Sequence, residues 1–397
     1  MPNDIYNIET DLEVSIFAYP SDVMLWSVSR YDNANWASGS EVQAWQTVTT
    51  SVASVITNNA VTIEQGFKRS ATPQAVIVLQ NPEYDPFNNV TIRTGTPIRV
   101  RARITPDTAP FWITIFEGKI DTASASYSHE WLNTVTLNCV TDMRDVLSFT
   151  APNGLTTIDP AYATNYIDAI NTAGGFNIGA SAVPANLGYL LTGASGTAPV
   201  NVGELLNQIA DTNLGALVFK PGEIQPIRYV NLAEFGDVDT TAPYVDFEAE
   251  ITANPTRADF SDITIGFNTE EILNTVTFQT VAGYGPVTLT NTQSRDLMGE
   301  LSKNVTTLHA DSADATAWAN LFASVLPERR VKDVSAPVIK RTGQLNEWLV
   351  TADLFDVASV YVNNAQVTID EKYFITGINH VINRFTWNTI FTLWRGR

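Results

Sequence analysis

The chain has 397 residues, and its 23 Lys and Arg against 42 Asp and Glu give a formal net charge of −19 at pH 7. Its hydrophobic content of 44% is ordinary for globular proteins, so the chain can bury a substantial core and general disorder is excluded. The acidic excess argues against a nucleic-acid-binding groove and against an anionic membrane surface, because both need clustered basic residues.

Targeting and redox signals are absent from the amino-acid pattern. The first ten residues lack the basic region and apolar run of a secretory signal peptide, and no apolar stretch approaches about 18 residues, so we expect no membrane span. A single cysteine, Cys139, cannot form an internal disulfide. It lies in a strand-like segment, which favours a buried small side chain over a reactive thiol.

Alternation of apolar and polar residues dominates the chain. The alternating segments are rich in β-branched and aromatic residues and are separated by Gly, Pro, Asn and Asp, which predicts β-strands. The predicted strands are 75–79, 98–104, 111–116, 134–140, 216–219, 274–278, 359–362 and 389–394.

Three helices are predicted between these strands. The first begins at Asp159-Pro160, buries one face through 166–170 and ends at Gly174-Gly175. The second begins with a capping-box-like pair, Asn201 and Glu204. The third covers 311–326 with an apolar stripe and ends at Pro327, and we interpret the stripe as core packing. The stripe is formed by Trp318, Leu321, Phe322, Val325 and Leu326.

The layout predicts a mainly β (α+β) fold in three parts. A first β-barrel domain is expected over 1–152, a mixed α/β domain over 153–240, and a second β-barrel domain with its embedded helix over 241–397. Turn-forming residues mark the two boundaries, and the Gly- and Ala-rich stretch 188–199 is expected to be a loop.

The two β-rich parts carry a similar pattern. In the first, 95–101 precedes Phe116-Glu-Gly-Lys-Ile-Asp121 and 132–137; in the last, 355–362 precedes Phe374-Ile-Thr-Gly-Ile-Asn379 and 387–393. The order and the spacing agree together, so we interpret the pattern as a duplication. Each unit is expected to be a strand, a strand that ends at a Gly turn, and a closing strand.

We interpret the basic and aromatic clusters as surface, interface or core features. Tight basic groups occur at Lys68-Arg69, at Arg99, Arg101 and Arg103, and at 328–332. The three arginines alternate with apolar residues, which predicts one solvated or interface face of a strand. Three tryptophans within twenty residues could stack on sugars, but core or interface packing is favoured. They are Trp26, Trp36 and Trp45.

Catalytic and metal-binding patterns are weak, and we expect no catalytic, cofactor or metal site. The histidines are scattered, no zincin, nucleophile-elbow or phosphate-loop motif occurs, and one Cys with three His argues against a Cys/His metal site. Carboxylate pairs of the glycosidase type remain open, as does a calcium site at Asp237 and Asp239. The histidines are His129, His309 and His380, and the further carboxylate pairs are Glu270-Glu271 and Asp353/Asp356.

Several collinear segments resemble the tail hub, or minor tail protein, of long-tailed bacteriophages, a family whose structural archetype is the baseplate hub of contractile tails. The segments are 75–87, 95–101, Phe116-Glu-Gly-Lys-Ile-Asp121, Cys139-Val-Thr-Asp142, the run 201–219, Ile272-Leu-Asn-Thr-Val276 and the helix around Trp318. The resemblance spans nearly the whole chain, and its specificity comes from the order of the segments.

The resemblance implies a non-enzymatic structural protein at the tail tip of a virion, assembled in the host cytoplasm. Members form a homotrimeric ring in which two similar barrels per protomer give pseudo-sixfold symmetry. Such a ring joins the hexameric tail tube and distal tail protein to a tip fibre or spike. It nucleates tail assembly with the tape measure protein and forms part of the DNA exit channel, without stable nucleic-acid binding.

Two alternatives stay open: a distal tail or receptor-binding tail protein, and a β-rich glycan hydrolase of the tail tip. The chain ends at the last predicted strand, so we expect adsorption and wall cutting to be done by other proteins. We also expect acidic residues to line the channel, because they would repel the DNA phosphates and let the duplex slide.

Overall fold

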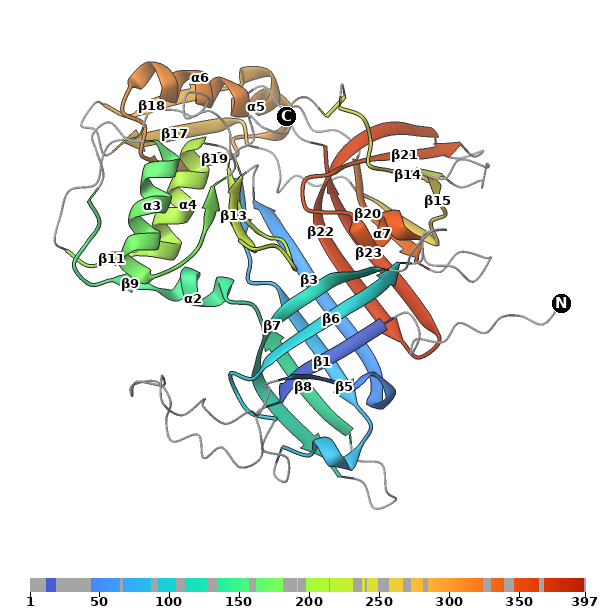
Figure 1. The fold of residues 1–397 in the computed structure, drawn as a ribbon. Helices are drawn as coiled ribbons and strands as arrows, with labels where there is room; N and C mark the ends of the chain where they lie inside the picture. The colour runs from blue at the N-terminus through green and yellow to red at the C-terminus, as the bar shows by residue number, and fades with distance from the viewer. Residues whose placement is uncertain are drawn as a thin grey trace.

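The structure of the chain is a computed structural model. It describes residues 12–18, 44–64, 67–86, 92–104, 111–127, 134–156, 162–180, 191, 198–213, 215–230, 238–239, 241–248, 257–266, 273–280, 285–323, 330–338, 346–363 and 368–395. Strands outnumber helices along these residues, which confirms the predicted mainly β fold (Figure 1).

The described residues up to 230 form thirteen strands. They are β1 (Leu12–Ala18), β2 (Ala44–Thr47), β3 (Val52–Glu64), β4 (Phe67–Ser70), β5 (Gln74–Leu79), β6 (Pro97–Ile104), β7 (Phe111–Ser126), β8 (Thr134–Val140), β9 (Thr150–Ala151), β10 (Gly179–Ala180), β11 (Val200–Asn201), β12 (Ala216–Phe219) and β13 (Ile227–Val230).

The described residues after 230 add ten strands and three of the six α-helices. The strands are β14 (Val245–Glu248), β15 (Arg257–Ala258), β16 (Asp262–Gly266), β17 (Thr275–Thr280), β18 (Val287–Thr290), β19 (Ser302–Thr307), β20 (Arg330–Pro337), β21 (Val357–Asn363), β22 (Thr368–Asn383) and β23 (Thr386–Trp394). The helices of the chain are α2 (Met143–Ser148), α3 (Ala163–Gly174), α4 (Val202–Asn213), α5 (Thr292–Met298), α6 (Ser312–Ala323) and α7 (Glu347–Thr351), with 3₁₀ turns η2 (Thr49–Ser51) and η3 (Pro82–Tyr84).

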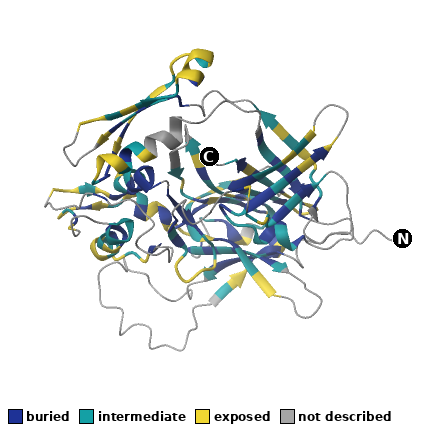
Figure 2. Cartoon of the chain, turned by 90° about the horizontal axis from the view of Figure 1, so that it is seen from above, coloured by how far each residue is buried: buried dark blue, intermediate teal, exposed yellow. Residues whose placement is uncertain are grey.

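One sheet unites the beginning and the end of the chain. Its main path runs β15-β14-β21-β22-β3-β5-β8-β7-β6-β1-β2, and β23, β20 and β16 extend it from β22. Inward-facing side chains of both parts, such as Val55, Ile77, Leu137 and Phe391, are fully buried in one continuous core. Buried positions accordingly gather in the middle of the molecule and exposed ones at its periphery (Figure 2).

The predicted duplication appears as two sets of strands with the same pairing order. The first set reads β3-β5-β8-β7-β6, and the second reads β16-β20-β23-β22-β21. Every neighbouring pair within each set is antiparallel. We call these sets repeat 1 and repeat 2. The long strands β7 and β22 correspond, and each has 16 residues.

The glycines of the repeated motif lie inside strands, so the prediction of a strand ending at a Gly turn is wrong for both repeats. Strand β7 runs through Gly118, and β22 runs through Gly377. A Cβ atom at Gly118 would lie 2.4 Å from the carbonyl oxygen of Val140 on β8, and one at Gly377 would lie 3.0 Å from Cβ of Thr392 on β23. Glycine is therefore needed for close approach of a neighbouring strand.

The middle of the chain forms a separate apolar core around α3 and α4. Tyr166, Ile167 and Ile170 are buried as predicted, and α3 ends with Gly175 in the left-handed conformation, at φ +66°. Its predicted start is wrong, because the helix begins at Ala163 and its cap uses the Asn165 side chain, which accepts a bond from the Tyr162 N–H at 2.8 Å. The start of α3 is therefore set by the capping interaction at Tyr162, three residues after the predicted cap at Asp159.

The predicted start of α4 is confirmed. Asn201 Oδ1 accepts a hydrogen bond from the Glu204 N–H at 3.2 Å, and Leu206 and Ile209 are buried. Helix α6 covers 312–323, within the predicted span, and Asp311 caps it by accepting a bond from the Ala313 N–H at 2.7 Å. The side chains of its predicted apolar stripe lie outside the described residues.

The second half also contains a small sheet of its own, ordered β18-β17-β19, which contacts α6 (Figure 1). Most of the predicted loop 188–199 lies outside the described residues. None of the helices in the described parts of the chain is long and apolar enough to cross a membrane.

Candidate assembly interface

Repeat 1 and repeat 2 meet where β3 pairs with β22. Seven residue pairs join the strands in antiparallel register, from Gly377 opposite Ala60 to Asn383 opposite Ser54. Val55 and Ile382 are fully buried on the core side of this pairing. The contact is heterologous, because the two repeats contribute different strands. Repeat 1 contributes β3, and repeat 2 contributes an edge of β22, the strand that corresponds to β7. We call it the internal junction.

A buried histidine lies at the internal junction. His380 on β22 stands opposite Thr57 on β3, and its Nδ1 lies 2.7 Å from Oγ1 of Thr389. The Trp387 indole N–H points to the same nitrogen at 3.4 Å. Burial lowers the pKa of His380 to about 4, because the charged ring loses its hydration. The histidine is thus a neutral part of the packed junction at pH 7.

The strand of repeat 1 that corresponds to β22 has an open edge. Lys119 on β7 pairs with Pro97 of β6 on one side and Val140 of β8 on the other. On the β6 side, the pairing ends where the Gly95 N–H donates to the Ile120 carbonyl at 2.7 Å. Among the described residues, no strand occupies that side of 122–126. This is the edge that β3 fills in repeat 2.

The strand of repeat 2 that corresponds to β3 has the complementary open edge. Strand β16 pairs with β20 alone among the described strands. The Ser261 N–H donates to the Ser335 carbonyl across that pairing at 2.7 Å. Because peptide groups alternate along a strand, Asp262 and Thr264 present their N–H groups to the other side. The described part of the chain therefore carries one open edge of each kind.

Contacts from the middle of the chain hold the β3–β4 hairpin beside the internal junction. Arg69 on β4 forms a two-bonded ion pair with Asp211 on α4, whose side chain is only 7% exposed. The Asn59 amide on β3 donates to the Phe219 carbonyl at 2.9 Å. Paired charges and satisfied backbone groups make this attachment specific.

The predicted arginine face exists, and the charges of Arg99 and Arg101 are compensated. Arg101 donates to both carboxylate oxygens of Glu13 at 2.6 and 2.7 Å, and the Arg99 guanidinium lies 4.2 Å from the centre of the Trp45 ring. Trp45 also packs edge-on against Phe17 at 5.4 Å, which supports the packing interpretation. Trp26 and Trp36 lie outside the described residues.

The structure brings together one of the predicted carboxylate pairs. The Asp353 N–H donates to Oδ2 of Asp356 at 2.7 Å, and the Asp353 carboxylate pairs with Lys220 at 2.5 Å. Burial raises the pKa of Asp356 to about 6, although the hydrogen bond from the Asp353 N–H acts in the opposite direction. Glu270, Glu271 and Asp237 lie outside the described residues, as does His129.

The remaining candidate groups are dispersed. His309 is buried beside Thr307 and Phe278, and burial lowers its pKa to about 4. Cys139 is buried, and burial raises its thiol pKa to about 12, which fits the inert interpretation. In the described part of the chain, no three His, Cys, Asp or Glu side chains gather where they could hold a metal ion.

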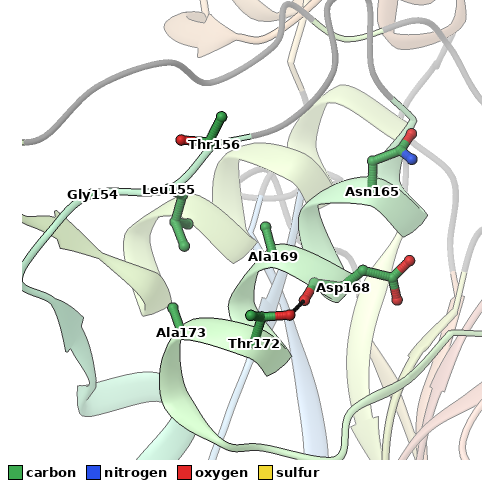
Figure 3. A pocket seen from close by; sticks show the side chains of 8 residues that line it. All are labelled: Gly154, Leu155, Thr156, Asn165, Asp168, Ala169, Thr172 and Ala173. Carbon is green, nitrogen blue, oxygen red and sulfur yellow. Dashed lines mark hydrogen bonds between the residues drawn. The ribbon is translucent and has the colours of Figure 1, made fainter.

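A pocket of about 480 Å³ lies between α3 and the turn after β9 (Figure 3). Its lining is Gly154, Leu155, Thr156, Asn165, Asp168, Ala169, Thr172 and Ala173. The Thr172 hydroxyl donates to the Asp168 backbone carbonyl at 2.8 Å, so the helix satisfies its own polar groups there. Asp168, the one ionisable side chain of this lining, is exposed. The pocket therefore offers no paired acid and base.

Sequence reasoning missed both β3 and β16 and therefore the internal junction and the open edges. Strand β16, Asp262-Ile-Thr-Ile-Gly266, does alternate, and that alternation was the available signal. The pairing of β3 with β22 joins positions more than 300 residues apart, and short-range periodicity carries no information about it.

Comparison with known proteins places the fold. A tail protein from Neisseria meningitidis MC58 is similar with a TM-score of 0.59 at 12% identity, covering 96% of both chains. The 43 kDa tail protein of prophage MuSo2 from Shewanella oneidensis gives 0.55 at 10% identity, covering 97% of this chain and 98% of that one.

A prophage tail protein from Listeria monocytogenes EGD-e gives a TM-score of 0.51 at 10% identity, covering 96% of this chain and 94% of that one. No family model and no curated sequence matches the chain. The chain thus shares its fold with these three tail proteins over nearly their whole length, which confirms the resemblance seen in the sequence at the level of the fold.

Proposed function

We propose that the chain is the structural hub of a phage tail tip. The observation that carries the proposal is the pair of complementary open edges, one on β7 and one on β16, beside an internal junction that already joins the equivalent strands. If β16 of one copy adds to β7 of the next, the internal junction is repeated between copies. Heterologous contacts of this kind close into a ring when the rotation between units permits it.

A ring of three chains would contain six repeats and therefore six similar junctions, three within chains and three between them. Such a ring offers a pseudo-sixfold face to a hexameric tail tube and distal tail protein, while its true threefold symmetry suits a tip fibre or spike. In this role it would nucleate tail assembly with the tape measure protein and form part of the DNA exit channel. The fold shared with phage tail proteins supports the same role.

Native mass measurement and negative-stain imaging test the ring. We expect a trimer of about three times 43.5 kDa and ring-shaped particles. A hexamer would instead favour the distal tail protein, and a stable monomer at assembly concentrations would contradict the proposal. A screen on host-wall polysaccharides addresses the hydrolase: activity that disappears when Asp353 and Asp356 are both changed to Asn would favour it.

A single proline tests the edge directly. Thr264→Pro removes an N–H that faces the open side of β16 and is not used in the pairing with β20. We expect folded monomers that form no ring. Thr264→Val is the matched control, because it keeps the N–H and the branched shape, and it should assemble normally. Ring formation by the proline variant at wild-type concentrations would show that β16 is not the assembling edge.

A further inference from the structure

The internal junction fuses the repeats into one eight-stranded surface. The strands follow in the order β16-β20-β23-β22-β3-β5-β8-β7, and their registers align the outward side chains in rows. One row reads Pro337, Asn388, Val381, Ile56, Val76, Asn138 and Thr122. The alternate residues of these strands, such as Val55 and Leu137, point into the core. We call the outward surface the bare face.

The bare face is almost free of charge. Charged residues at its paired positions occur only at the two ends: Asp262, Asp333 and Arg330 on β16 and β20, where Lys332 occupies the neighbouring bulge, and Lys119 on β7 opposite Val140. The other side chains are hydroxyls, amides or apolar groups. They include Ser54, Asn58, Gln74, Ser124, Ser126, Thr134, Thr136, Asn379, Asn383, Thr386, Ile390 and Thr392.

The opposite half of each repeat carries the charges. In repeat 1, the outward positions of β1, β6 and the first half of β7 hold Glu13, Arg99, Arg101 and Glu117. In repeat 2, Asp246 on β14, Lys372 and Asp370 on β22 occupy the corresponding region. A chain with 65 charged residues thus leaves the paired outward positions of the central strands, from β23 through β22 and β3 to β8, without charge. The scarcity of charge on the bare face therefore follows from where the charged residues stand along the strands, and not from a low overall content of charged residues.

The layering of the molecule indicates where the bare face lies in a ring. The described side chains of the bare face are exposed or half-buried, whereas the other layers of both repeats pack against the core behind it. A closed ring has more room on its outer circumference than on its inner one, so the extra layers belong outside. Resting on the proposed hub function, we infer that the bare face forms the wall of the channel and that this wall is neutral.

A neutral wall differs from the acidic lining expected from the net charge. Hydroxyl and amide groups hydrogen-bond to water but release no counterions when a phosphate passes, so they give the duplex neither a binding site nor a strong barrier. The occupant that the wall suits is double-stranded DNA in transit. The acidic residues are then located on the outer layers, where they keep the assembled particle soluble.

Lysines placed on the wall make the inference testable. In Asn58→Lys with Asn388→Lys, both exposed positions lie on the bare face, one in each repeat, and a trimer gains six charges. Six phosphate contacts would lose about a thousandfold in affinity between 50 and 200 mM salt. The control variant carries Thr47→Lys with Asn363→Lys, at exposed positions of the outer layers.

The probe is a short linear duplex compared with a covalently closed DNA minicircle. Only a molecule with free ends can thread a channel, so the wall variant should retain the linear duplex and not the circle, while wild type retains neither. The control variant should treat both DNA forms alike. Equal binding of circle and linear duplex by the wall variant, or linear-duplex binding by wild type, would overturn the inference.

Trimer mass is measured first for every variant. A wild-type chain that forms no trimer would contradict the hub function and not the neutrality of the surface. A wild-type trimer whose wall-lysine variant also forms trimers but gains no DNA retention would contradict the luminal position of the bare face while leaving the hub function in place.

Discussion

Replacing Gly118 by Ala tests the strand packing from which the repeats were identified. The new Cβ would lie 2.4 Å from the Val140 carbonyl oxygen and 2.9 Å from its carbonyl carbon, roughly 1 Å inside ordinary contact. Both atoms belong to backbone, so no side chain can turn away. Strands β7 and β8 must part at the Lys119–Val140 pair, where their ladder begins.

The expected cost of Gly118→Ala is about 3 kcal/mol. Overpacking of a tight site costs about 1–3 kcal/mol, and each weakened backbone hydrogen bond adds about 1 kcal/mol. The reduced freedom of the unfolded chain returns about 0.5 kcal/mol. Urea unfolding followed by tryptophan fluorescence gives the change, and hydrogen exchange at β8 amides localises it.

Gly→Ala substitutions at two other positions give comparison values for the free energy of unfolding. A Cβ at Gly377 would meet side chains only, at 3.0 Å from Thr392 and 3.3 Å from Ala60, so Gly377→Ala should cost less than Gly118→Ala. Nothing lies within 4 Å of a Cβ at Gly285, and Gly285→Ala should leave stability unchanged. A Gly118→Ala protein as stable as Gly285→Ala would refute the close approach of β7 to β8.

Three further outcomes are expected. The raised pKa of Asp356 favours its protonated form in the fold, so wild-type stability is lost as pH rises through about 6. Asp356→Asn should therefore be about 2–3 kcal/mol more stable than wild type at pH 8 and equally stable at pH 4. Urea titration at the two pH values measures the difference. The lowered pKa of His380 means that stability falls as pH drops from about 6.5 towards 4, by about 3 kcal/mol; His380→Gln should remove this part of the pH dependence, and an unchanged slope would contradict it. Asp211→Asn should cost about 2 kcal/mol and speed hydrogen exchange in α4, whereas Asp168→Asn on the exposed face of α3 should not.

Short-range patterning found the strands whose two faces differ. Strand β8 matches its prediction to the residue, and β5 and β6 each differ by one, because apolar and polar side chains alternate between core and solvent. Strand β3 escaped notice for a physical reason. Its Asn58-Asn59 pair is typical of turns, yet Asn58 stands on the bare face and Asn59 is held by the Phe219 carbonyl. Tertiary contacts there override local preference.

The glycines of the repeated motif have a different role from the turn that we predicted. Gly118 and Gly377 recur because a neighbouring strand passes close to each, and a turn prediction followed only because glycine is commonest in turns. The candidate interface was beyond sequence reasoning altogether. It depends on which strand edges remain unpaired, and that is decided by register between distant segments rather than by any residue type.

The internal junction also has a consequence for the accuracy of closure. Heterologous edges generate a closed ring at one angle and an endless helical filament at others. In a ring of single-repeat units every angle would be set by a reversible contact. In the proposed ring, every second angle would be fixed within a polypeptide, at a junction that His380 and the Arg69–Asp211 pair hold from two sides. If the ring forms as proposed, the internal junction would set the curvature that each added copy has to match.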